Sequence, residues 1–307
     1  VEKIKKGIQE KFGVGVFPNW IGPQRFGSTR PVTALVGRHV LNGKFDLAVE
    51  TYLGFPGFEE KGEVECFRSD WRNNHSVDNS LELVPHRLGY EKEMLLHLKK
   101  NPDDWKGAFS RLPRNLQLMT IHALQSEAFN RLISSRIEKT MSLTVPEVGD
   151  VVAPLDDNGQ IETNRMVVVR QNTKDRISRN CLMKRLAITG FLPGSQYLKT
   201  IGNPGIIEQS VIDDMNLDSI DWNVIEIPRL SSKGTRRSLT SWFNEFSVEV
   251  VSSADSEEFS ERWKDGPHSK STWHPEGACL RFRFVLPSGS YATTLMREFM
   301  HAPIFQL

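Results

Sequence analysis

A regular stripe of apolar residues between positions 115 and 137 constrains the fold of this chain more than any other feature. Its members recur at spacings of three and four, the period of one buried helix face: Leu118, Ile121, Ala128, Phe129, Leu132, Ile133 and Ile137. Asn115 follows Pro113 and is the expected N-cap, and Gln125 lies on the stripe as a buried amide whose hydrogen bonds are satisfied. We therefore expect one long helix with a buried face.

The segments on either side of this helix differ in character. Apolar spacing with Gly and Pro boundaries predicts further helices at residues 1–12, 31–40, 44–52, 91–98, 206–215 and 291–300. Short β-branched or alternating segments predict strands at residues 148–154, 166–169, 187–191, 222–227, 246–251 and 278–286. Residues 53–84 show no sustained period and predict a long irregular connection. Helices and strands that do not alternate regularly indicate an α+β fold.

Composition limits the classes of function. The chain has 307 residues, which favours two domains, and its 38% hydrophobic and 25% charged residues are typical of globular proteins. Because the formal net charge is only +1, a polyanionic partner must be met by a local cationic patch. Cys66, Cys181 and Cys279 are too far apart for a disulfide framework or a thiolate zinc site, which fits a reducing cytoplasm. No apolar run approaches the roughly 20 residues that cross a bilayer.

Residues 18–27 carry the strongest functional signal. Glycine and proline within these ten positions oppose both helix and strand, and they predict a rigid loop. The loop combines amide, guanidinium and large aromatic groups: Asn19, Trp20, Gln24, Arg25 and Phe26. Such a set suits the recognition of a planar, hydrogen-bonding base. The alternative interpretation is a tight turn with buried aromatic residues.

Two basic clusters are candidates for phosphate contacts against the neutral background. The first comprises Lys174, Arg176, Arg179, Lys184 and Arg185, and the second comprises Lys233, Arg236 and Arg237. Either cluster is explained equally well as a solvated face. The spacing of His268, His274 and Cys279 is not typical of a metal site, so we expect no metal.

Several segments together resemble the TruD family of tRNA pseudouridine synthases, and they occur in that family's order. They are residues 18–27, 111–115, 125–130, 148–152, 231–237 and 286–298. The resemblance covers nearly the whole chain, and it implies an α+β pseudouridine synthase core that carries an inserted domain specific to TruD. On this basis residues 1–44 and 251–307 belong to the catalytic core, and residues 45–250 form the insertion.

The resemblance also implies roles for single residues. The family's Asn-Tyr-Phe-Gly loop, whose asparagine and phenylalanine touch a flipped uridine, matches Asn19, Trp20, Ile21 and Gly22. Because Ile21 replaces the aromatic residue, Tyr291, at the position of a family aromatic, is the expected stacking partner. The expected RNA-binding set is completed by Gln24, Arg25, Phe26, Lys233, Arg236 and Arg237.

The nucleophilic aspartate that the resemblance implies is not evident in this chain. The family carries it in a Gly-X-Lys-Asp motif ahead of the asparagine loop, and no aspartate precedes Asn19 here. We therefore expect the nucleophile upstream of Val1. Residues 172–176 imitate the motif, but Asp175 lies far downstream and is better explained as a carboxylate at the start of a helix.

Two functions remain open at this point. The first is a tRNA pseudouridine synthase that isomerises a uridine, at the family's usual position 13, with no metal or cofactor. The second is a non-catalytic RNA-binding protein that retains the cleft without the nucleophile. In both cases we expect tRNA as the partner, no membrane association, and a cytoplasmic monomer.

Overall fold

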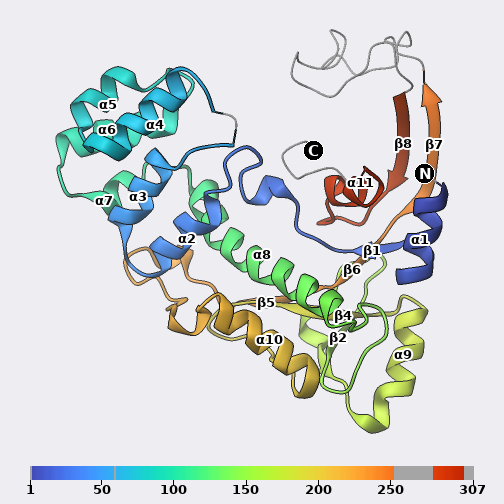
Figure 1. Cartoon of the computed structure of the whole chain (residues 1–307). Coiled ribbons are helices and arrows are strands. Elements are labelled where there is room, and N and C mark those ends of the chain that lie inside the picture. Colours follow the sequence, from blue (N-terminus) through green and yellow to red (C-terminus); the bar gives the residue numbers. More distant parts are fainter. Residues whose placement is uncertain (1, 59, 252–278, 301–307) are drawn as a thin grey trace.

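The structure, a computed structural model, describes residues 2–58, 60–251 and 279–300 (Figure 1). Its helices are α1 (Glu2–Phe12), α2 (Thr33–Leu41), α3 (Phe45–Gly54), α4 (Glu63–Asn74), α5 (Val77–Leu83), α6 (Gly89–Lys100), α7 (Trp105–Phe109), α8 (Arg114–Glu138), α9 (Lys174–Leu182), α10 (Gly202–Asp214) and α11 (Ala292–Met300). Its strands are β1 (Val16–Pro18), β2 (Val151–Pro154), β3 (Val167–Val168), β4 (Leu186–Leu192), β5 (Thr235–Ser238), β6 (Thr240–Trp242), β7 (Asn244–Val251) and β8 (Cys279–Val285). The fold is α+β, as the sequence predicts.

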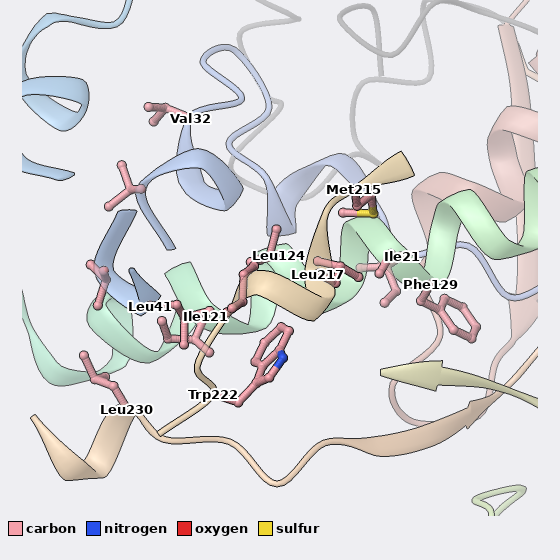
Figure 2. Packing of buried hydrophobic residues seen from close by; sticks show 14 of the residues in the cluster. Ile21, Val32, Leu41, Ile121, Leu124, Phe129, Met215, Leu217, Trp222 and Leu230 are labelled. Atoms are coloured by element: carbon pink, nitrogen blue, oxygen red, sulfur yellow. The ribbon is translucent and has the colours of Figure 1, made fainter. Parts of the chain in front are cut away.

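The long helix α8 is the centre of the molecule. Side chains from α8, from residues 21–41 and from residues 215–230 meet in one hydrophobic core (Figure 2). Helix α2 crosses α8 so closely that a Cβ atom at Gly37 would overlap the carbonyl oxygen of Thr120. The predicted buried amide is confirmed, because Gln125 is buried and donates to the carbonyl oxygen of Pro193 and to Ser232 Oγ. The expected Asn115 cap is wrong, because α8 begins at Arg114 and its N-cap is Pro113, two residues earlier.

A four-stranded antiparallel sheet packs on α8. Its strand order is β3-β2-β4-β5, and the register aligns Val152 with Ile188 and Gly190 with Arg237. At Gly190 an added Cβ would press against Phe129 and Leu132 of α8, so the small residue permits close packing of the strand on the helix. Strands β2, β3 and β4 were predicted, whereas β5 was missed.

Helices α3 to α7 form a subdomain at one end of the molecule, on the left of Figure 1. The predicted irregular connection at residues 53–84 is wrong, because this stretch contains α4 and α5. The buried residues Val64, Phe67 and Trp71 recur at spacings of three and four, which is a helical signal. Polar residues surround these three positions, which explains why the period was overlooked.

A second, smaller core joins the two ends of the described chain. It contains Ile8 of α1, Phe17 of β1, Phe243, and Leu295 and Phe299 of α11. Strand β1 pairs with β6, and β7 pairs with β8 in a separate two-stranded sheet. The predicted helices at both ends and the strands β7 and β8 are confirmed. The residues that connect β7 to β8 lie outside the described part.

The predicted strand at residues 222–227 is also wrong. Trp222 and Val224 are buried on either side of exposed Asn223, as in a strand, but Ile227 breaks this alternation, and no described strand pairs with the segment. Their backbone instead bonds to a neighbouring loop, since Val224 N donates to Ser231 Oγ and Trp222 accepts from Ser232 N. Among the helices in the described ranges, none combines the length and the apolar character that a membrane span requires.

Candidate functional site

The loop at residues 18–27 and the segment around Tyr291 form one continuous surface, although they lie about 270 positions apart in sequence. Arg25 Nη2 donates a hydrogen bond to Tyr291 Oη over 3.3 Å, and Thr293 Oγ1 donates to Gln24 Oε1 over 3.2 Å. A Cβ atom at Gly22 would lie 2.7 Å from Tyr291 Cδ1, so glycine allows the Tyr291 ring to lie on the loop backbone. The two sequence signals therefore meet in space.

Asn19 is fixed in this surface by three hydrogen bonds. Its backbone N–H donates to the carbonyl oxygen of Leu239 over 2.9 Å, which continues the pairing of β1 with β6. Its side-chain Nδ2 donates to the carbonyl oxygen of Ser238 over 3.0 Å, and its Oδ1 accepts from Arg237 Nη2 over 2.6 Å. Only 6% of Asn19 is exposed. The amide is thus a rigid part of the surface, not a mobile loop side chain.

Arg237 connects the three parts of the site. Its Nη2 atom donates to Asn19 Oδ1 and also to the carbonyl oxygen of Gly289, 2.9 Å away, next to the Tyr291 segment. Its guanidinium group lies over the ring of Phe129 of α8, with 5.6 Å between the guanidinium carbon and the ring centroid. Within the described residues, its buried Nε atom has no hydrogen-bond partner.

The site carries positive charge without a matching carboxylate. Within the described part of the chain, Arg25 and Arg237 bond only to neutral acceptors, namely the Tyr291 hydroxyl, the Asn19 amide and the Gly289 carbonyl. The pKa of Arg237 is lowered to about 10, mainly because the group is buried. Nearby Tyr291 acts to raise this pKa, and the charge of Arg25 acts to lower it. The guanidinium groups remain charged at neutral pH, so the site suits an anionic ligand.

The other bulky residues of the loop face an apolar cavity of about 420 Å³. Its lining includes Trp20, Ile21, Phe26 and Phe58, together with residues of α8 and α11. Asn130 of α8 holds the loop here, since Ile21 N donates to Asn130 Oδ1 and Asn130 Nδ2 donates to the carbonyl oxygen of Ile21, both over 2.9 Å. The predicted set is therefore split, because Asn19, Arg25, Arg237 and Tyr291 do not line this cavity.

The two arginines of β5 have opposite surroundings. Neighbouring strand residues point to opposite faces, and Arg236 is only 2% exposed. It forms an ion pair with Glu208 of α10 and donates from Nε to Thr189 Oγ1 over 2.8 Å and from Nη2 to the Thr189 carbonyl oxygen over 2.8 Å. The expectation that Arg236 contacts phosphate does not fit this burial, because its donors are already occupied. Lys233 is exposed and has no such constraint.

The remaining candidates lie elsewhere. Asp175 is exposed in the first turn of α9, as the helix-start interpretation predicts. His268 and His274 lie outside the described residues, and the side chain of Cys279 is not described either. In the part of the chain that the structure covers, no three His, Cys, Asp or Glu side chains form a group that could hold a metal ion.

Three contributors to the site were not predicted as site residues. Phe129 lies beneath Arg237, Asn130 holds the backbone of Ile21, and the carbonyl oxygen of Gly289 accepts from Arg237. The sequence places Phe129 on the buried stripe of α8, and it places Phe129 and Asn130 in one of the segments that resemble the TruD family. That resemblance was the available signal, but it gave neither residue a role in the site. A carbonyl oxygen has no sequence signal at all.

Comparisons with known proteins identify the family of the chain. A family model described as tRNA pseudouridine synthase D (TruD) matches residues 1–299. Proteins named tRNA pseudouridine synthase D in Methanosarcina barkeri and Methanosarcina acetivorans are each 34% identical over 307 residues, which is 100% of this chain and 65% of theirs. A crystal structure titled as a TruD protein from Methanosarcina mazei superposes with a TM-score of 0.83 at 31% identity, over 100% of this chain and 65% of that one. The chain therefore spans about two thirds of the length of these relatives, and it belongs to the TruD family of tRNA pseudouridine synthases.

Proposed function

We propose that the protein is a tRNA pseudouridine synthase and that this chain provides the surface that grips the everted uridine, at position 13 of tRNA. One observation carries the proposal: Asn19, Arg25, Arg237 and Tyr291 converge on one surface from three distant segments. The two guanidinium groups there have no carboxylate partner within the described residues. An RNA nucleotide supplies both the planar base and the negative charge that such a surface fits.

The reaction requires the site to stabilise the negative charge of a uracil base that is detached from its sugar. When the bond between N1 and C1′ breaks, its electron pair stays on the uracil and spreads over the two carbonyl oxygens. The carboxylate of the nucleophilic aspartate bonds to C1′ as the base leaves. The base then turns and C5 bonds to C1′ while the bond from C1′ to the aspartate breaks, after which C5 loses a proton and N1 gains one. The atoms and electrons balance without an oxidant or reductant. Guanidinium and hydroxyl donors in a partly buried site would stabilise the base while it carries the charge.

Uridine must leave its stack to reach such a site, and this costs a few kcal/mol. We propose that the Tyr291 ring, which lies against the backbone of Gly22, provides the stacking face, worth roughly 1–3 kcal/mol. Ile21 is only 7% exposed and its backbone is held by Asn130, so in this role it would contribute packing beneath the site.

The nucleophile is part of the same proposal. The relatives are longer than this chain, which spans 65% of their length. We propose that the aspartate lies in a segment of the full-length protein upstream of Val1. We further propose that residues 1–44 and 251–307 belong to the catalytic domain and residues 45–250 to the insertion. The smaller core supports a link between the two ends, because it joins α1 to α11.

The test is the release of tritium from a tRNA transcript labelled at C5 of uridine, with the full-length natural protein. We expect release with the unmodified protein, and a rate lower by about 100-fold or more with Asn19→Ala, since this variant removes a fixed amide and leaves Arg237 without one acceptor. Asn73→Ala, on the exposed face of α4, is the matched control and should retain the full rate.

Three results would separate the alternatives. An unchanged rate for a folded Asn19→Ala variant would remove the assigned role of the loop. Binding of tRNA by the full-length protein without any tritium release would favour the non-catalytic RNA-binding function. Loss of release in both Asn19→Ala and Asn73→Ala would show a general sensitivity to substitution rather than a specific site.

A further inference from the structure

Helix α9 and the residues that flank it carry a concentrated positive charge. Residues 170–185 contain one carboxylate, Asp175, and six cationic side chains: Arg170, Lys174, Arg176, Arg179, Lys184 and Arg185. The whole chain has a net charge of only +1, so the remainder is slightly acidic. The charge is therefore local, as binding to a polyanion requires in a protein of nearly neutral composition.

These cations are not used in the fold. Five of the six are exposed and Lys174 is half-buried. Within the described part of the chain, none of the six forms an ion pair with a carboxylate, whereas Arg236 and Arg136 do so in the core. Lys184 bonds to a neutral group, because its Nζ donates to the carbonyl oxygen of Val14 over 3.3 Å. A solvated face would be expected to contain more compensating carboxylates.

The backbone holds these side chains in a fixed arrangement. At the start, Arg170 N donates to Thr173 Oγ1 over 3.1 Å. On the inner face Ile177 is buried and anchors the helix. At the end, Lys184 adopts a left-handed conformation with φ of 56°, and Arg185 N donates to the carbonyl oxygen of Asn180 over 2.9 Å. The cluster therefore presents its charge with little loss of backbone entropy on binding.

A groove of about 550 Å³ lies beside the α9 cluster. Its lining includes Lys184 of the cluster, together with residues of α9, β4, the end of α1, β1 and β6. Val16, in its lining, lies three residues before Asn19, and three residues of strand extend about 10 Å. The groove therefore borders both the α9 cluster, at Lys184, and the strand that leads to Asn19.

We propose that the α9 cluster, residues 170–185, binds the phosphate backbone of the same RNA whose uridine enters the site at Asn19. This inference rests on the proposed function for the identity of the polyanion. The concave groove favours a strand of RNA over a flat anionic membrane. Phosphate contacts of this kind set position and affinity but carry no sequence information.

The test uses the double variant Arg176→Glu/Arg179→Glu, which reverses two exposed charges of α9. The control is Arg87→Glu/Lys100→Glu, which makes the same charge change at exposed residues just before α6 and at its last position, at the opposite end of the molecule (Figure 1). Affinity for a tRNA transcript is measured by fluorescence anisotropy from 50 to 300 mM salt, and folding is checked by circular dichroism.

We expect the α9 variant to bind at least about tenfold more weakly at low salt. The slope of log affinity against log salt should become shallower by about 1 for each lost phosphate contact. The control variant should show nearly the same tRNA affinity and the same salt slope as the unmodified protein. Equal losses in both variants, or an unchanged slope in a folded α9 variant, would overturn the proposal. The proposal would also be overturned if the α9 variant kept its full affinity for tRNA but lost binding to vesicles that contain phosphatidylserine. That result would assign the cluster to membranes.

Kinetics of the full-length protein distinguish this inference from the proposed function. If α9 only binds the backbone, the α9 variant should raise KM for tRNA and leave kcat nearly unchanged. Absence of tritium release from the unmodified full-length protein would refute the synthase activity alone, because the difference in tRNA affinity between the α9 variant and its control would still stand.

Discussion

Arg236 and Arg237 provide a direct test of how the site is built, because adjacent residues of one strand should respond in opposite ways to the same substitution. Arg236 lies in the core against Glu208, and Arg237 lies in the candidate site against Asn19. We consider Arg236→Gln and Arg237→Gln, which remove the charge and keep a side chain that can donate hydrogen bonds.

For Arg236→Gln we expect a large loss of stability. Glu208 is only 4% exposed, and after the substitution its carboxylate would be buried without a counter-charge. Breaking a buried ion pair on one side costs about 3–5 kcal/mol of the free energy of unfolding. The variant should therefore unfold at much lower denaturant or fail to fold, and any weaker RNA binding would follow from unfolding.

For Arg237→Gln the two contributions to stability cancel in part. Burial lowers the pKa of Arg237 from 12.5 to about 10, so holding this group charged costs roughly 3 kcal/mol, which the substitution removes. Against this, the charged hydrogen bonds to Asn19 and Gly289 are lost, at about 1.5–3 kcal/mol each. We expect a net loss below about 3 kcal/mol, together with at least tenfold weaker tRNA binding.

Urea unfolding followed by circular dichroism gives the free energies, and fluorescence anisotropy gives the tRNA affinities of the folded proteins. The reasoning fails if Arg237→Gln loses as much stability as Arg236→Gln. It also fails if folded Arg237→Gln binds tRNA as tightly as the unmodified chain, because the Arg237 guanidinium would then contribute nothing to tRNA binding.

Two further predictions test the packing and the chemistry of single residues. Gly37→Ala should destabilise the protein by about 2 kcal/mol or more, because its Cβ would overlap the Thr120 carbonyl oxygen, whereas Gly89→Ala has free space and should be neutral or slightly stabilising in urea unfolding. Burial raises the pKa of the Cys181 thiol to about 12. Iodoacetamide at pH 8 should therefore label exposed Cys66 and leave Cys181 nearly unmodified, as measured by peptide mapping with mass spectrometry. Comparable labelling of the two cysteines would contradict the burial of Cys181.

The sequence predicted those elements whose signals are local. The stripe along α8 and the Gly and Pro boundaries of the loop at residues 18–27 depend on spacing within about 25 positions. The prediction failed where the buried residues are polar. Strand β5 alternates between half-buried and buried positions, but its buried members are Arg236 and Ser238, so hydrophobic alternation is missing. Helix α4 was overlooked for a related reason, because three apolar residues are dispersed among polar ones.

By itself the sequence determined the fold class, the long helix, the loop at residues 18–27 and the family, because each rests on residue types in a fixed local order. Only the tertiary structure decided which candidates act together. It separated Arg237 from Arg236, joined Arg25 to Tyr291, and turned Trp20 into a cavity beside the polar site. The physical reason is that burial and charge pairing depend on contacts between distant segments, and local spacing carries no information about those contacts.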